Sequence, residues 1–323
     1  MVPSTPSPPR AAEPGGAPPR SAPRRARTPL RNGRADRITL ALMIGVPTVL
    51  VIGLVWLPAA ATVVFSFTRW DGIGGLDTLE WVGTQNYTDA FTLYPPFWPA
   101  LRNNLIWLVF LFVVPTLLGM LLAVLLDREL RGGRIYQSIF YLPVVLSLGL
   151  VGFIWQLIYS QDQGLLNTFL GATAGAEPVD WFGDPDINLY AVLVAAAWRH
   201  TGYIMLLYLA GLKAVDPSLR EAAAIDGAGP VRTFTSVVFP ALRPINLVVL
   251  VVTVIDALRA FDIVWIINRG RNGLELISAL VTANVIGEAS RVGFGSALAV
   301  IMLAFSLVFI LIYVSTLLRG ADR

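Results

Sequence analysis

The chain has 323 residues, of which 55% are hydrophobic and only 14% are charged, a charged fraction well below that of soluble domains. It contains no cysteine, which excludes disulfides, cysteine-ligated zinc and iron–sulfur clusters. The formal net charge of +3 does not indicate a nucleic-acid-binding protein, because the excess positive charge is confined to an N-terminal stretch beside an apolar run.

Residues 1–37 are rich in Pro, Ala, Arg, Ser and Gly, and hold eight Arg against Glu13 and Asp36. Nothing in this stretch is apolar enough to pack, so we expect a disordered basic tail. We favour a solvated cytoplasmic extension, and a lipid- or partner-binding arm is the alternative. Residues 319–323 are expected to form a second, short cytoplasmic tail.

Six apolar runs follow the basic tail, and we predict each of them as a transmembrane helix. They cover residues 38–67, 105–126, 139–159, 189–212, 245–267 and 297–318. A further apolar run, 276–287, is too short to cross a bilayer, so it should lie along the interface or re-enter from one side. The sequence therefore predicts an all-α, polytopic membrane protein whose transmembrane domain covers residues 38–318.

The distribution of basic residues predicts the orientation of these helices. If the N-terminus lies inside, 17 Lys and Arg residues fall in inner segments and five in outer segments. This asymmetry satisfies the positive-inside rule. Both termini and the segment 216–240 are then expected on the cytoplasmic side of a cell membrane.

Segment 216–240 is a polar interruption between two membrane-length apolar runs, and it cannot be embedded in lipid. Asp216 is a common N-cap residue, and Pro217 suits the first position of a helix. Gly227 is placed to end that helix, and Pro230 suits the start of a second short one. We predict a compact helical loop held between two membrane helices.

The same segment resembles the EAA loop of bacterial ABC-importer permeases, whose pattern is Glu-Ala-Ala, three residues, Gly, nine residues and Ile-x-Leu-Pro. The pattern falls on Glu221, Ala222, Ala223, Gly227, Val237, Phe239 and Pro240, with Val and Phe in place of Ile and Leu. Asp226 begins the Asp-Gly-Ala sequence usual in the sugar-importing branch. The resemblance implies a type I importer permease fold of six transmembrane helices, in which Glu221, Ala222, Ala223, Asp226 and Gly227 form the coupling contact with an ATPase subunit.

Four other stretches are similar to segments of the MalF-like sugar permeases of this family. They are residues 81–87, 97–104, 256–265 and 293–299. The stretch Asn-Arg-Gly-Arg-Asn-Gly at 268–273 replaces the Thr-x-Gly-Gly-Pro usual in the family. The resemblance implies a second homologous permease subunit, two ATP-binding cassette subunits and an extracytoplasmic solute-binding protein as partners.

No nucleotide-binding motif is present in the sequence. A phosphate-binding loop requires a lysine that follows a glycine-rich turn and precedes Ser or Thr. Lys213, the only lysine, lies in Gly-Leu-Lys-Ala. We therefore predict a non-enzymatic permease subunit, without catalytic residues or a cofactor of its own.

Charged residues inside the predicted fourth and fifth spans form the second candidate site. Arg199 and His200 lie in the fourth span, and Asp256, Arg259 and Asp262 lie in the fifth. Charges at membrane depth usually face a cavity or a partner. Arg199 and Asp256 are predicted at similar depth, so they are expected to pair, either lining a polar passage or locking two helices. For His200 a core position is expected, and for Asp262 a solvated one; with one His and no Cys, no metal site is expected.

These observations predict a permease subunit that forms half of a sugar pathway. One alternative is the same scaffold carrying glycerol phosphate or polyamine, which should show an excess of one charge in its cavity. A second is an ion-coupled secondary transporter, which should show an internal repeat. A third is a membrane enzyme, for which no nucleophile–base pair stands out.

Overall fold

The computed structural model describes residues 33–128, 131–171, 177–287 and 290–321. Most of the predicted disordered tail, residues 1–32, lies outside these ranges, as do the last two residues of the predicted C-terminal tail. The chain divides into two compact units, residues 1–55 and residues 56–323.

In the first unit, helix α1 spans Arg34–Val51. It begins before the predicted residue 38, because the backbone N of Gly33 donates a hydrogen bond to Oδ2 of Asp36 at 3.1 Å and so closes the first turn. The helical backbone continues as a π-helical turn, η1 (Ile52–Trp56). The following Pro58 has no N–H for a regular α-helical bond, which accounts for the local change of winding.

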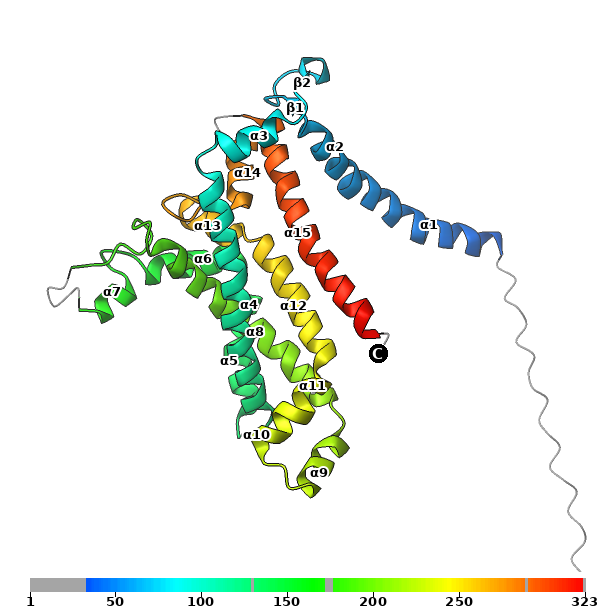
Figure 1. Ribbon diagram of the computed structural model, residues 1–323, viewed down its shortest axis with the longest axis vertical. Helices are drawn as coiled ribbons and strands as arrows, with labels where there is room; N and C mark the ends of the chain where they lie inside the picture. Colours follow the sequence, from blue (N-terminus) through cyan, green and yellow to red (C-terminus); the bar gives the residue numbers. More distant parts are fainter. Residues whose placement is uncertain (1–32, 129–130, 172–176, 288–289, 322–323) are drawn as a thin grey trace, which may run out of the picture. The chain divides into compact units, whose positions relative to one another are not determined.

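The second unit is almost entirely helical (Figure 1). In chain order it contains α2 (Leu57–Phe65), β1 (Thr68–Arg69), η2 (Leu76–Thr78), β2 (Glu80–Trp81), α3 (Gln85–Thr92), α4 (Phe97–Asp127), α5 (Gly133–Val145), α6 (Leu148–Ile158), α7 (Leu165–Phe169), α8 (Asn188–Ala214), α9 (Pro217–Ile225), α10 (Pro230–Thr233), η4 (Phe234–Val238), α11 (Phe239–Ala241), α12 (Arg243–Leu258), α13 (Asp262–Asn268), α14 (Ile277–Val285) and α15 (Val292–Ala321). The all-α prediction is confirmed. The last helix extends past the predicted residue 318.

Helices α4 and α8 lie side by side and form the centre of this unit (Figure 1). They approach closely at Gly119, where a Cβ atom would lie 2.8 Å from Cγ2 of Ile204 and 2.9 Å from the backbone N of Met205. A glycine at such a crossing allows two helix backbones to come together. Trp107 of α4 and Leu193 of α8 are buried in the same core. The core is therefore a helix–helix interface, as expected for a polytopic membrane protein.

In the part of the chain that the structure describes, three helices are long and apolar enough to cross a membrane: Asp36–Phe65, α4 and α8. The predicted third span, 139–159, is instead a bent pair, with 101° between α5 and α6. Oγ of Ser147 accepts a hydrogen bond from the backbone N of Leu150 at 3.2 Å and caps α6. Because a serine cap competes with continuation of the preceding helix, the predicted third span is broken at Ser147 into two helices.

The predicted fifth span is also interrupted. Helix α12 ends at Leu258, well before the predicted residue 267, and α13 starts only at Asp262. The short run 276–287 contains α14, which is too short to cross, as predicted. Its Ile277 and Leu280 are buried together with Leu298 of α15, so α14 packs into the helical core.

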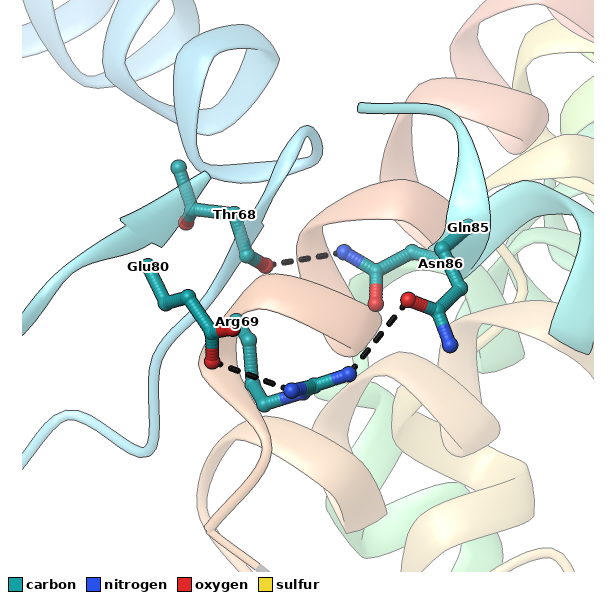
Figure 2. Close-up of polar contacts among 5 residues, drawn as sticks. All are labelled: Thr68, Arg69, Glu80, Gln85 and Asn86. Carbon is teal, nitrogen blue, oxygen red and sulfur yellow. Dashed lines mark hydrogen bonds and ion pairs between the residues drawn. The ribbon is translucent and has the colours of Figure 1, made fainter. Parts of the chain in front are cut away.

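The polar segment that follows α2 folds into a two-stranded hairpin held against α3. Nη1 of Arg69 donates to Oε2 of Glu80 at 3.0 Å, and its Nη2 donates to Oε1 of Gln85 at 3.3 Å (Figure 2). Nδ2 of the buried Asn86 donates to the backbone oxygen of Thr68 at 2.8 Å. Side chains of α3 therefore hold β1, and the pair of Arg69 and Glu80 joins β2 to β1.

Candidate functional site

The predicted EAA loop is a closed helical unit with a cap at each end. Oδ1 of Asp216 accepts a hydrogen bond from the backbone N of Ser218 at 2.9 Å, and this bond lowers the pKa of the Asp216 carboxyl. At the other end Gly227 adopts φ +74°, and the backbone N of Ala228 donates to the oxygen of Ala223 at 2.9 Å. This is a Schellman ending, which requires a left-handed residue. The predicted boundaries of the first helix are confirmed.

Four of the five predicted coupling residues lie on the surface of α9 or directly after it. Glu221, Ala222, Asp226 and Gly227 are exposed. Ala223 is only 7% exposed, because its side chain packs inward and its carbonyl closes the helix end. The exposed residues are therefore the ones available to a partner, and Ala223 fixes the helix from within.

Two apolar side chains of this loop project into solvent, and the sequence reasoning did not select them. Ile225, the last residue of α9, is 87% exposed, and Val231 of α10 is 77% exposed. Isolated apolar residues inside a polar loop were the signal available in the sequence. Their exposure adds an apolar component to the surface that carries Glu221.

A second site is a cavity between helices of the second unit. Arg199, His200, Asp256 and Arg259, the four predicted pathway residues, line one cavity of about 230 Å³. Its walls also include apolar and aromatic side chains of α4, α6 and the α12–α13 junction; these are Trp107, Leu111, Leu148 and Phe261. The structure thus brings together charges that the sequence places more than fifty positions apart.

The partner of Asp256 is His200, and not Arg199 as predicted. Nδ1 of His200 lies 3.5 Å from Oδ2 of Asp256, and its Nε2 lies 3.0 Å from Oγ1 of Thr253. Residues 199 and 200 differ by about 100° around the helix axis, so only His200 faces α12. Nε of Arg199 is buried without a hydrogen-bond partner in the described part of the chain.

Asp256, Arg259 and Asp262, predicted in one fifth span, do not lie on one continuous helix. Arg259 is the C-cap residue of α12, and Asp262 opens the next helix. All three nevertheless line the cavity, because the break at residues 259–261 turns the chain around it. Asp262 is exposed, as predicted. The C-terminal end of α12 lies beside this cavity. The last backbone carbonyl groups of a helix have no partner within the helix, so they need polar groups nearby.

Comparison with known proteins places this arrangement among membrane transport proteins. A family model described as "Binding-protein-dependent transport system inner membrane component" matches residues 116–316. The xylose/arabinose import permease XacH of Haloferax volcanii is 31% identical over 280 residues, covering 84% of this chain and 86% of that protein. The trehalose/maltose transport system permease MalF of Thermococcus litoralis is 32% identical over 235 residues, covering 72% and 78%.

The fold is also found in a solved structure. A chain of a bacterial ABC transporter involved in import of the acidic polysaccharide alginate superposes with a TM-score of 0.76, covering 88% of this chain and 96% of that one. The two sequences are 19% identical. This likeness concerns the arrangement of helices alone.

Proposed function

This chain belongs to the family of binding-protein-dependent transport system inner membrane components, and we propose that it forms half of the translocation pathway of a sugar importer. Two relatives are named for pentoses and for glucose disaccharides, which supports a mono- or oligosaccharide as the substrate. The permease domain would cover residues 38–318, with the basic tail before it.

The observation that carries this proposal is the connection between the two sites. The exposed helix α9 lies in the segment between α8, which carries Arg199 and His200, and α12, which carries Asp256. A partner that pushes on α9 would therefore act on both helices that supply polar groups to the cavity. This connection is what an ATP-driven importer needs, because the energy source and the pathway lie in different subunits.

The partners follow from the same reasoning. Two ATP-binding cassette subunits would bind at the exposed residues of α9 and at the equivalent loop of a second permease. A solute-binding protein would deliver sugar on the opposite side of the membrane. The chain would contribute no nucleotide site, and both termini would be cytoplasmic, in agreement with the positive-inside rule.

The charge of the cavity supports a neutral substrate. Arg199 and Arg259 are balanced by Asp256 and Asp262, so neither a phosphate nor a polyamine is favoured. Guanidinium and carboxylate groups together donate and accept hydrogen bonds, as sugar hydroxyls require. Trp107 and Phe261 supply the apolar surface against which a sugar ring can pack.

Uptake by purified protein tests the proposal. The chain would be reconstituted in liposomes with its ATPase, partner permease and binding protein, and supplied with labelled sugars, glycerol phosphate or spermidine. We expect ATP-dependent uptake of a neutral sugar. Transport of glycerol phosphate or spermidine instead would overturn the substrate class, and ion-driven uptake in the absence of ATPase would overturn the importer class.

Variants of the cavity sharpen this test. Replacement Asp256→Asn or Arg199→Gln should raise the sugar concentration for half-maximal uptake by about tenfold or more, since a hydrogen bond to a charged group contributes about 1.5–3 kcal/mol. Asp162→Asn is the matched control, because Asp162 is an exposed carboxylate that does not line the cavity. Equal effects of the cavity and control substitutions would refute a pathway role.

The coupling role of α9 requires its own variant. Glu221→Ala removes an exposed carboxylate from α9. Gly227→Pro disrupts the end of α9, because Gly227 has φ +74° and proline cannot adopt a positive φ. We expect ATP-driven uptake and stimulated ATPase activity to fall while the protein still reaches the membrane. Unchanged uptake by this variant would remove the coupling role.

A further inference from the structure

The guanidinium of Arg220 joins the EAA loop to two long helices. Nη1 of Arg220 donates to Oδ2 of Asp127 at 2.9 Å, and Asp127 is the last residue of α4. Nη2 donates to the backbone oxygen of Leu212 at 3.3 Å, in the last turn of α8. One side chain in the first half of α9 therefore contacts the ends of both helices that form the centre of the unit.

Asp127 occupies a position that is electrostatically unfavourable without a cation. A carboxylate at the C-terminal end of a helix faces the negative end of the helix dipole. Its side chain is only 14% exposed, and Arg220 is its nearest cation, with Nζ of Lys213 at 3.7 Å. The Lys213 side chain is 61% exposed, so solvent weakens its attraction. Asp127 is therefore placed to hold Arg220.

The contact between α9 and α4 is polar instead of apolar. A cavity of about 300 Å³ lies beside the pair, and residues of α4, α9, α10 and η4 line it, among them Asp127 and Arg220. Apolar packing between the EAA loop and α4 is made by η4, whose Val238 is buried together with Leu126 of α4. The hydrogen-bonded ion pair is the polar link that α9 itself makes to α4.

The two helices that Arg220 contacts also supply walls of the cavity that contains Asp256. Helix α4 supplies Trp107 and Leu111, and α8 supplies Arg199 and His200. We propose that Arg220 and Asp127 are positioning residues, which convert a displacement of α9 into a movement of α4 and α8 and so into a change of the cavity. This inference rests on the proposed function of α9 as the ATPase contact.

The measurement that tests it is the number of sugar molecules taken up per ATP hydrolysed by the reconstituted complex. Arg220→Gln and Asp127→Asn should each lower this ratio by about fivefold to tenfold, the usual range for loss of a coupling between two sites. ATPase activity should persist, because the surface that carries Glu221 is unchanged. A ratio equal to that of the unmodified protein in both variants would overturn the proposal.

Exchange of the two charged residues tests whether the ion pair itself is required, or only an arginine at position 220 and an aspartate at position 127. The double substitution Asp127→Arg with Arg220→Asp keeps the pair and suits both helix dipoles, since it places a cation at a C-terminus and an anion in a first turn. It is made in a Lys213→Gln background, because Lys213 would repel the new arginine. We expect part of the ratio to return, because the exchange restores the pair with α4 but not the bond to the oxygen of Leu212; no recovery in a fully assembled complex would overturn transmission through the pair.

Lys213→Gln alone is the matched control. It removes a charge 3.7 Å from the same carboxylate but leaves both hydrogen bonds of Arg220 in place, so the ratio should stay within about twofold of the unmodified value. If Arg220→Gln does not reach the membrane, Arg220→Lys replaces it. Lysine keeps the charge but lacks the fork that reaches Asp127 and Leu212 together, and the ratio should again fall.

Failure of this inference and failure of the proposed function give different results. If α9 is not the ATPase contact, the unmodified chain will neither co-purify with the ATPase nor show ATP-dependent uptake. If only the transmission is wrong, the unmodified complex will transport sugar and the Arg220 and Asp127 variants will transport it with the same yield per ATP.

Discussion

Two loops of this protein are fixed to the helical core by opposite means. The loop between α13 and α14 is held by buried asparagines: Nδ2 of Asn103 donates to the backbone oxygens of Gly273 at 2.9 Å and Glu275 at 3.0 Å. Nδ2 of Asn188 donates to the oxygen of Asn272 at 2.9 Å. The EAA loop, residues 216–240, is exposed along most of its length, and its α9 is joined to α4 by the partly exposed Arg220 and the largely buried Asp127.

The difference indicates which loop can move as a unit. Neutral amides that bond to backbone oxygens at fully buried positions hold a loop in one place, because every displacement leaves a buried polar group unpaired. The first helix of the EAA loop, α9, is instead capped at both ends by Asp216 and Gly227, and most of its surface is exposed. Segments with few buried contacts have the lowest local stability, which suits a part that a partner must push.

The largest effect is expected from Gly273→Ala in the asparagine-held loop. Gly273 adopts φ +84°, and a Cβ atom there would lie 2.4 Å from the backbone oxygen of Pro185. Left-handed strain and overpacking together should destabilise the protein by about 2–4 kcal/mol. Thermal unfolding in detergent measures this. A loss no larger than that of Gly227→Ala would contradict the difference between the two loops.

Loss of an asparagine anchor should be the next largest effect. Asn103→Ala leaves the backbone oxygens of Gly273 and Glu275 without their donor, which should lower the free energy of unfolding by about 2 kcal/mol. Hydrogen exchange of residues 268–276 should rise in the same variant. Gln85→Ala is the control, since it removes one exposed bond of 3.3 Å and should change the unfolding temperature little.

Gly227→Ala should have a smaller and purely local effect. Its φ is +74°, but no atom lies within 4 Å of a Cβ placed there. Only the left-handed strain remains, about 1 kcal/mol. Gly229→Ala is the matched control, because Gly229 is equally open but has φ −69°. Protease cleavage near residue 227 should increase only in the first variant; equal cleavage of both would contradict the Schellman ending.

Acidification should have the smallest effect and should be confined to the EAA loop. The pKa of Asp216 is lowered from 3.8 by its bond to Ser218, so the cap contributes its full stability above pH 3.8 and loses it as the pH falls through the lowered value. Hydrogen exchange at the start of α9 should increase there. Asp216→Asn, which caps without titrating, should abolish the pH dependence, while residues 268–276 should show none in either protein.

Much of the EAA loop could be predicted from the sequence, because local rules govern it. Proline, as at position 217, is favoured at a helix start, and glycine, as at position 227, is favoured at a left-handed helix end. The outward position of Ile225 and the inward position of Ala223 follow from packing against later residues, which no local rule specifies. The asparagine anchors were not predictable either, since Asn103 and Gly273 are 170 positions apart.

The sequence by itself determined the class of the protein, the apolar runs and the bounds of α9, since hydrophobicity and the conformational limits of proline and glycine act over a few residues. Only the tertiary structure decided that α5 and α6 meet at 101°, that α12 ends beside the cavity, and that His200 and not Arg199 faces Asp256. These outcomes depend on which side chains meet across different helices. The packing of the whole unit determines these contacts between helices. A rotation of α8 by one residue, about 100°, would place Arg199 instead of His200 opposite Asp256.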